Sequence, residues 1–198
     1  MGLDFAYING QTPLEDDEKD ELLIPTIATR EELDEFEQQN IEEAIQWVLI
    51  KSLNAKAILT EQFVKRLHKH MYGNVWNWAG NFRKTNKNLG VDKWQISMAL
   101  KALLDDTIYW VENDTFTPDE VAIRFKHRIV SIHCFPNGNG RHSRLMADVI
   151  VDKIYHLSVF SWGARSLVKQ SDTRTNYLKA VREADENNYE PLLLFARS

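Results

Sequence analysis

His133-Cys134-Phe135-Pro136-Asn137-Gly138-Asn139-Gly140-Arg141-His142-Ser143-Arg144 is the stretch of sequence that decides how this chain is interpreted. Before it, residues 118–132 carry apolar side chains at helical spacing, and the same spacing resumes from Arg141. The order is therefore a helix, a histidine, a glycine-rich turn and a second helix.

A helix start that follows a glycine-rich turn favours an anion. Its first backbone N–H groups lack partners within the helix and carry the positive end of the helix dipole. Gly138 and Gly140 remove side chains where a phosphate would approach the backbone. Arg141 and Arg144, three residues apart, can point to one place and donate paired hydrogen bonds, and Asn139 adds an amide donor. The pattern predicts a site for two or more linked phosphates.

His133 lies at the opposite edge of the same turn. An imidazole with a pKa near neutrality can take a proton from a hydroxyl group during its attack on phosphorus. From the residues alone, the segment indicates a nucleotide-dependent transferase or hydrolase.

The bulk properties narrow the class of protein. A chain of 198 residues fits one domain, and its net charge of −5 argues against a nucleic-acid surface. Cys134 is the single cysteine, which rules out a disulfide within the chain and favours the cytoplasm. The first twenty residues do not read as a secretory signal, and no apolar run is long enough for a membrane span. We expect a cytoplasmic protein that binds neither nucleic acid nor membrane.

Helical patterns dominate the chain after an acidic start. Thr29 opens a capping box, and Thr117 with Pro118 combines an N-cap with proline at the first helical position. Ser97 is expected to cap another helix. The predicted helices cover 30–48, 60–72, 97–111, 118–132, 141–156 and 171–186, with a short one from Pro191. The fold class predicted is an all-α bundle of about seven or eight helices with one short β-hairpin flap.

The domain organisation is simple. Residues 1–28 are predicted to form an acidic, solvated arm that packs at most Leu22-Leu23-Ile24 on the body, and residues 29–198 a single catalytic domain. Within that domain, residues 74–96 are rich in asparagine, glycine and tryptophan, which indicates a long loop with a hairpin turn near Asn88-Leu89-Gly90.

Residues 133–144 resemble the signature of the Fic family, His-Pro-Phe-x-[Asp/Glu]-Gly-Asn-Gly-Arg-x-x-Arg. A second stretch, Trp78-Ala79-Gly80-Asn81-Phe82-Arg83, resembles the Trp-Ala-Gly-x-x-Arg found upstream of the family's flap. The resemblance covers roughly residues 60–190, and the arrangement is similar to that of the small stand-alone bacterial members. This chain departs from the signature at Cys134, where the family has proline, and at Asn137, where it has an acid.

The resemblance implies a protein adenylyltransferase. His133 would be the general base that activates a Ser, Thr or Tyr hydroxyl of a target protein for attack on the α-phosphate of ATP. Phe135 would anchor the loop in the core. The anion hole would consist of Gly138, Asn139 and Gly140, with Arg141 on the β-phosphate and Arg144 on the γ-phosphate.

The flap would pair with an extended segment of the target by strand addition, although an ordinary loop is the equal alternative. Its candidate docking residues are Thr85, Asn86, Lys87, Asn88, Leu89 and Gly90.

Two positions of the signature bear on cofactor and reaction. The family's acid at position 137 binds the Mg²⁺ that bridges the nucleotide phosphates, so Asn137 predicts weaker Mg²⁺ binding with activity retained. Gly140 favours AMP transfer, because the kinase-like Doc branch has lysine there.

Many Fic enzymes are inhibited by a glutamate on a Ser/Thr-x-x-x-Glu-[Gly/Asn] helix, and no Ser or Thr here has Glu four residues later. Any restraint is therefore expected from an inhibitory partner protein in trans. A toxin role in a toxin–antitoxin pair would fit small stand-alone members, but no residue indicates it. The oligomeric state has no sequence signal.

Alternatives stay open at several points. The donor could instead be a UMP, phosphocholine or phosphate carrier, or the chain could be a nucleotide-binding regulatory module with little catalysis. Arg141 could pair with an acidic surface group, and Arg144 with Asp148 one turn on. Tyr177 could border the adenine or simply pack. Core or flap anchoring is expected for Trp76, Trp78, Trp94, Phe82 and Tyr72.

Overall fold

The computed structural model describes residues 13–164 and 170–198. Within these ranges the chain forms nine α-helices and one 3-10 turn, and no strand, so the all-α class is confirmed. The elements are α1 (Asp16–Lys19), α2 (Arg30–Leu49), α3 (Ala55–Ile58), α4 (Glu61–Tyr72), η1 (Lys93–Gln95), α5 (Ile96–Glu112), α6 (Pro118–Ile132), α7 (Asn139–Tyr155), α8 (Gln170–Asp185) and α9 (Glu190–Arg197).

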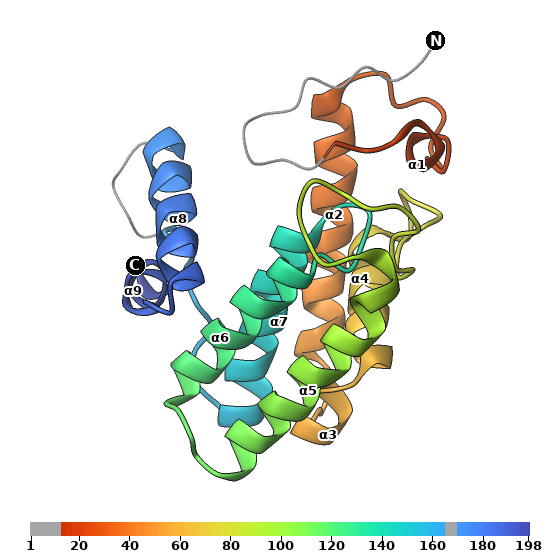
Figure 1. The fold of residues 1–198 in the computed structure, drawn as a ribbon. Coiled ribbons are helices and arrows are strands. Elements are labelled where there is room, and N and C mark those ends of the chain that lie inside the picture. Colours follow the sequence, from red (N-terminus) through yellow and green to blue (C-terminus); the bar gives the residue numbers. More distant parts are fainter. Residues whose placement is uncertain (1–12, 165–169) are drawn as a thin grey trace.

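The bundle is organised around α6 and α7, which pack along each other (Figure 1). Helix α5 packs on α6, α2 packs on α4, and the C-terminal pair α8 and α9 joins the bundle through α6. The short turn between α6 and α7 therefore lies at one end of the bundle, beneath the loop that precedes α5. In the part of the chain that the structure describes, no helix has both the length and the apolar character to cross a membrane.

Most helix starts follow the predicted chemistry. The Thr29 and Thr117 side chains accept hydrogen bonds from the backbone N–H groups of Glu32 and Glu120, and Thr29 completes a capping box. The expected Ser97 cap is wrong. Helix α5 begins one residue earlier, directly after η1, which Asp92 caps by accepting from the Trp94 N–H.

The expected β-hairpin flap is present as a loop and not as paired strands. The guanidinium of Arg83 donates to the carbonyls of Thr85 and Val91, and the side-chain oxygen of Asn86 accepts from the Lys93 N–H at 2.8 Å. Backbone groups that could have formed a strand ladder are thus bonded to side chains, which a search for alternating residues does not detect.

The acidic arm is less solvated than its composition indicates. Over residues 13–28, Leu14 is buried, the Glu18 carbonyl accepts from Trp78 Nε1 at 3.1 Å, and the Leu23 N–H donates to the Val75 carbonyl at 2.8 Å. Leu22 packs against the core, whereas the Leu23 side chain is exposed. The arm therefore packs on the loop that leads to the flap.

The three tryptophans of residues 74–96 divide into two kinds. Trp76 and Trp78 are buried core anchors as expected, and Trp76 Nε1 donates to Glu37 Oε1 at 2.8 Å. Trp94 does not anchor the flap. Its side chain is 83% exposed, and its main neighbour is the Lys93 ammonium, 4.9 Å from the ring centre.

Two buried histidines connect the core to the turn. His68 Nε2 lies 3.1 Å from the Asn137 carbonyl oxygen, and His68 Nδ1 accepts from the Gly80 N–H at 3.1 Å. His142 Nε2 lies 3.0 Å from the Val64 carbonyl oxygen. Burial is the main cause that lowers both pKa values, that of His68 well below its ordinary value and that of His142 to about 4.

These histidines predict that the protein loses stability in mild acid. The unfolded chain binds protons near pH 6.5, whereas folded His142 binds one only near pH 4, so the contribution is complete above pH 6.5 and lost as the pH falls toward 4. Each such histidine adds a slope of about 1.4 kcal/mol per pH unit. Urea unfolding at pH 7.5, 6.5 and 5.5 measures the slope, and His142→Gln should reduce it. An unfolding free energy that stays constant from pH 7.5 to 5.5 would contradict the prediction.

Candidate active site

The turn begins with a left-handed residue. His133 ends α6 with φ 58° and ψ 61°, and its N–H still bonds to the Ile129 carbonyl at 3.3 Å. A residue with a Cβ pays roughly 1–2 kcal/mol in this conformation, so the surroundings must hold it. The conformation turns the chain sharply away from α6 and starts the loop.

A pair of side-chain hydrogen bonds closes the loop. Asn139 Oδ1 accepts from the Phe135 N–H at 3.0 Å, and Asn139 Nδ2 donates to the Phe135 carbonyl at 2.8 Å. The Phe135 ring is fully buried and stacks on His68 with ring centres 3.7 Å apart. Phe135 therefore lies where an anchor should. The amide of Asn139 is engaged inside the loop, which leaves its backbone N–H for an anion.

The two glycines have different surroundings. A Cβ on Gly138 would lie 2.5–2.8 Å from atoms of the Tyr72 ring, and its φ is +76°. A Cβ on Gly140 would meet nothing within 4 Å. Gly138 is thus required by the backbone and by Tyr72, while Gly140 leaves open space at the start of α7, as expected for the approach of a phosphate.

The start of α7 has no protein cap. Gly138 is the N-cap residue, and no side-chain hydrogen bond caps this end. The first N–H groups of a helix lack acceptors within the helix, so this end offers donors and positive dipole charge to a ligand.

Arg141 forms an ion pair, and its acidic partner could not be identified from the sequence. Its Nη2 lies 2.7 Å from Glu37 Oε2, and Glu37 is a buried residue of α2. Tyr72 and Glu37 both raise the pKa of Arg141, against the effect of burial. The guanidinium is thus held beside the helix start with its charge largely offset.

Arg144 does not form the ion pair with Asp148 that its spacing allowed. Asp148 Oδ1 instead accepts from the Phe160 N–H at 3.1 Å, and both its oxygens accept from Trp162 Nε1. The Arg144 guanidinium lies 5.8 Å from the centre of the Tyr177 ring. Arg144 therefore keeps its positive charge at the side of α7 that faces α8.

His133 is buried beneath the flap, with only 6% of its surface exposed. A Cβ on Gly90 would lie 2.6 Å from the His133 Cβ, so only glycine lets the flap approach this closely. Burial, then the charges of Arg83 and Lys87, lower the pKa of His133 to about 4. The imidazole is neutral at pH 7 and can accept a proton.

Arg83 joins the flap to the His133 loop, a role that we did not assign from the sequence. Its Nε donates to the His133 carbonyl at 2.7 Å, while its remaining nitrogens donate to Thr85 and Val91 in the flap. Its own N–H donates to the Cys134 carbonyl at 3.0 Å. The sequence signal that could have identified this role is the position of Arg83 at the end of the Trp-Ala-Gly stretch.

Cys134 has a structural role in this loop. Burial raises the pKa of the Cys134 thiol to about 12, which fits such a role.

The flap residues are only partly open to a partner. Lys87 Nζ lies 2.5 Å from Glu18 Oε2, and Thr85 Oγ1 donates to Glu18 Oε1 at 3.4 Å, so these two contact the arm. Asn88 and Leu89 are exposed. Docking by backbone pairing would have to use this exposed tip.

Asn137 offers little to a metal ion. Its Oδ1 accepts from the Gly138 N–H at 2.6 Å. Within the described ranges, no group of three or more His, Cys, Asp or Glu side chains is placed to hold a metal. A neutral amide with one committed lone pair does not fit a protein-held Mg²⁺, which prefers carboxylates. No step of the chemistry below depends on such an ion.

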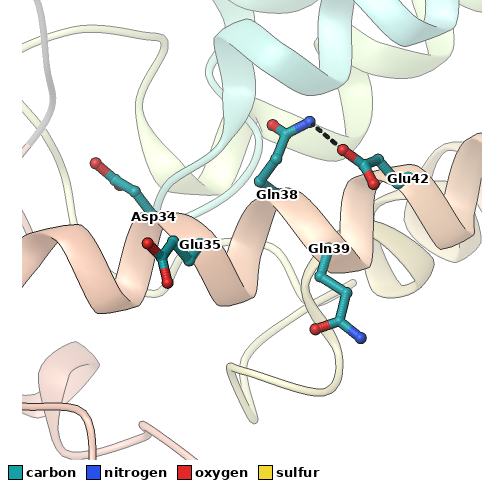
Figure 2. Close-up of a pocket in the computed structure, with 5 residues that line it drawn as sticks. All are labelled: Asp34, Glu35, Gln38, Gln39 and Glu42. Carbon is teal, nitrogen blue, oxygen red and sulfur yellow. Dashed lines mark hydrogen bonds between the residues drawn. The ribbon is translucent and has the colours of Figure 1, made fainter.

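A hollow of about 490 Å³ runs along α2 and is not a phosphate site (Figure 2). It is lined by Asp34, Glu35, Gln38, Gln39 and Glu42. Carboxylates repel a polyanion, and Asp34 lies close enough to raise the pKa of Arg141. The acidic helix therefore borders the Arg141 side of the turn without offering it a second anion site.

Comparisons with known proteins agree with the all-α fold. Residues 58–151 match the model of the Fic/DOC family. Among solved structures, a Fic domain signaling protein from Bacteroides thetaiotaomicron is similar (TM-score 0.60, 18% identity, 81% of this chain and 65% of that one). Fic-1 from C. elegans is similar over 89% of this chain and 50% of that one (TM-score 0.68, 20% identity). BepC from Bartonella tribocorum, with bound AMPPNP, is similar over 91% and 95% (TM-score 0.64, 16% identity). The chain thus spans about two thirds of the Bacteroides protein and half of the C. elegans chain.

The two glycines give a matched pair of substitutions. Gly140→Ala should keep or raise the free energy of unfolding, by at most about 1 kcal/mol, because its Cβ meets open space inside a helix. It should weaken AMPPNP binding by about tenfold or more, since the methyl group occupies the phosphate approach. Gly138→Ala should destabilise the fold by more than about 1 kcal/mol because of its φ and Tyr72. Urea unfolding and calorimetry measure both effects. Unchanged AMPPNP affinity in Gly140→Ala would mean that phosphate does not bind at this helix start.

Proposed function

Residues 58–151 of this chain belong to the Fic/DOC family, and from this premise we propose that the protein moves AMP from ATP to a hydroxyl side chain of a target protein. The observation that carries the proposal is the uncapped, side-chain-poor start of α7, which one short turn separates from a neutral histidine at the end of α6. The AMPPNP bound by the similar BepC supports a nucleotide as the donor.

In the proposed reaction His133 acts as the general base. The acceptor hydroxyl gives its proton to the His133 ring while its oxygen bonds to the α-phosphorus of ATP. The bond from that phosphorus to the oxygen bridging to the β-phosphate breaks, and pyrophosphate leaves with the electron pair. The N–H groups at the start of α7, with Arg141 and Arg144, would hold the transferred and leaving phosphates.

The low pKa of His133 is compatible with this role. A pKa near 4 leaves the ring unprotonated at neutral pH, but it also makes a weak base. A bound triphosphate adds negative charge beside the ring and raises its pKa toward the working range. Nucleotide binding would therefore strengthen the base just before it is used.

The target is proposed to dock at the exposed flap tip, near Asn88 and Leu89. An extended segment carrying a Ser, Thr or Tyr could add its backbone there, next to Gly90 and His133. Since Glu18 of the arm forms an ion pair with Lys87 of the flap, the arm would border the docked segment. An inhibitory partner acting in trans stays part of the proposal, because the chain lacks the family's inhibitory glutamate motif.

A second candidate is a nucleotide-binding module with little catalysis. Asn137 in place of an acid, and a base that is 6% exposed, both favour it. The two candidates differ in whether wild-type protein transfers AMP at all.

His133→Ala separates these candidates. We expect AMP transfer to fall at least about 100-fold, while AMPPNP affinity stays within about twofold, because the ring moves a proton and does not hold phosphate. Incubation with a lysate and ATP labelled on the α- or the γ-phosphate measures transfer, and only the α-label should appear on protein. His156→Ala, an exposed histidine at the end of α7, is the control and should transfer like wild type. Transfer of the γ-label would instead indicate phosphate transfer, and no transfer by wild type would favour the binding module.

Asn137→Asp tests the metal expectation. A carboxylate at this position should lower the Mg²⁺ concentration for half-maximal AMPPNP binding by about fivefold or more, since it adds charge to a hard oxygen ligand. Asn113→Asp adds the same charge at the end of α5 and serves as the control. The same Mg²⁺ dependence in Asn137→Asp and wild type would show that position 137 does not contact the ion.

A further inference from the structure

Lys126 is a buried ammonium group on α6, and its side chain is fully buried. Among the residues that the structure describes, its Nζ forms no hydrogen bond of normal length, and Tyr177 is the neighbour that most favours its charged form. Burying an ammonium group disfavours its charged form, and desolvation lowers the pKa of Lys126. A buried ammonium group of this kind is suited to binding an anion.

The surroundings of Lys126 connect it to the proposed phosphate site. Its Nζ lies 4.6 Å from the centre of the Tyr177 ring, and the Arg144 guanidinium lies 5.8 Å from the centre of the same ring. The charge of Arg144 also contributes to lowering the pKa of Lys126. Two cations thus share one aromatic neighbour, and they repel each other.

Among the described residues, neither Lys126 nor Arg144 forms an ion pair on this side of α7, and Asp185 and Asp148 act on them only from a distance. Arg141 is paired with the buried Glu37, whereas Asp148, the acid nearest to Arg144 by helical spacing, is bonded to Phe160 and Trp162. Asp185 lies near Lys126 but accepts from His127 at 2.8 Å. An anion bound next to Arg144 would interact favourably with both cations at once.

We propose that Lys126 and Arg144 form a subsite for the terminal phosphate of a nucleoside triphosphate, and that Tyr177 covers this subsite when it is empty. This inference rests on the proposed function, which places Arg144 at the far end of the phosphate chain. Binding moves the Tyr177 ring aside and replaces its contact with Lys126 by a charge-assisted hydrogen bond, the stronger of the two interactions. Lys126 thereby makes the site selective for triphosphates over di- and monophosphates.

Lys126→Met tests the subsite, because methionine keeps the apolar stem and removes the charge. Calorimetry with AMPPNP, inorganic triphosphate, ADP and AMP measures binding, and thermal unfolding measures stability. We expect AMPPNP and triphosphate to bind about tenfold more weakly, with ADP and AMP within about twofold of wild type. The free variant should unfold at a higher temperature than wild type, because the buried repulsion is gone. Lys101→Met, which removes an exposed lysine of α5, should change neither quantity.

Other outcomes overturn the subsite. Unchanged AMPPNP affinity in Lys126→Met overturns it. An equal loss of affinity for AMPPNP, ADP and AMP also overturns it, because such a loss shows a general effect on the pocket and no selectivity for the terminal phosphate. Absence of any AMPPNP or triphosphate binding by wild type also contradicts it. If Lys126→Met does not fold, Lys126→Arg keeps the charge and should retain the triphosphate preference; loss of that preference counts against the subsite. A wild type with this preference that never transfers AMP contradicts the proposed function alone.

Discussion

The structure depends on one pair of hydrogen bonds, those from the Asn139 side chain to the backbone of Phe135. They fix the start of α7 against the end of α6 and so set the distance between His133 and the helix start. The Phe135 ring, stacked on His68, holds the same turn from the core side. Because all these groups are buried, the turn cannot relax without exposing polar atoms that lack partners.

Charge is distributed unevenly around this turn. Glu37 neutralises Arg141 on the side of α2, while Arg144 and Lys126 face α8 with no acidic side chain paired to them in the described structure. A polyphosphate lying along the helix start would therefore be held most strongly at one end. This polarity would orient the nucleotide, and orientation decides which phosphorus faces the base.

The sequence was informative where chemistry is local. Caps such as Thr117 predicted helix starts because they act over three residues, and the turn itself could be read because its donors and glycines are contiguous. The ion pair between Glu37 and Arg141 could not be predicted from the sequence, since over one hundred residues separate the two. Lys126 stands among basic residues, and no local pattern signals its burial, which arises only from tertiary packing. The hairpin was expected from its turn residues, but the carbonyls it needed are bonded to Arg83, a side chain with no strand pattern.

Arg83 has a mechanical consequence. One guanidinium donates to the His133 carbonyl and to two carbonyls of the flap, so a displacement of the flap would strain the hydrogen bond to the His133 carbonyl. In the proposed reaction, a target segment that pushed the flap outward would also pull His133 away from the phosphorus. On that proposal, productive docking would come from the outer edge of the flap, and a peptide wedged beneath the flap would act as an inhibitor.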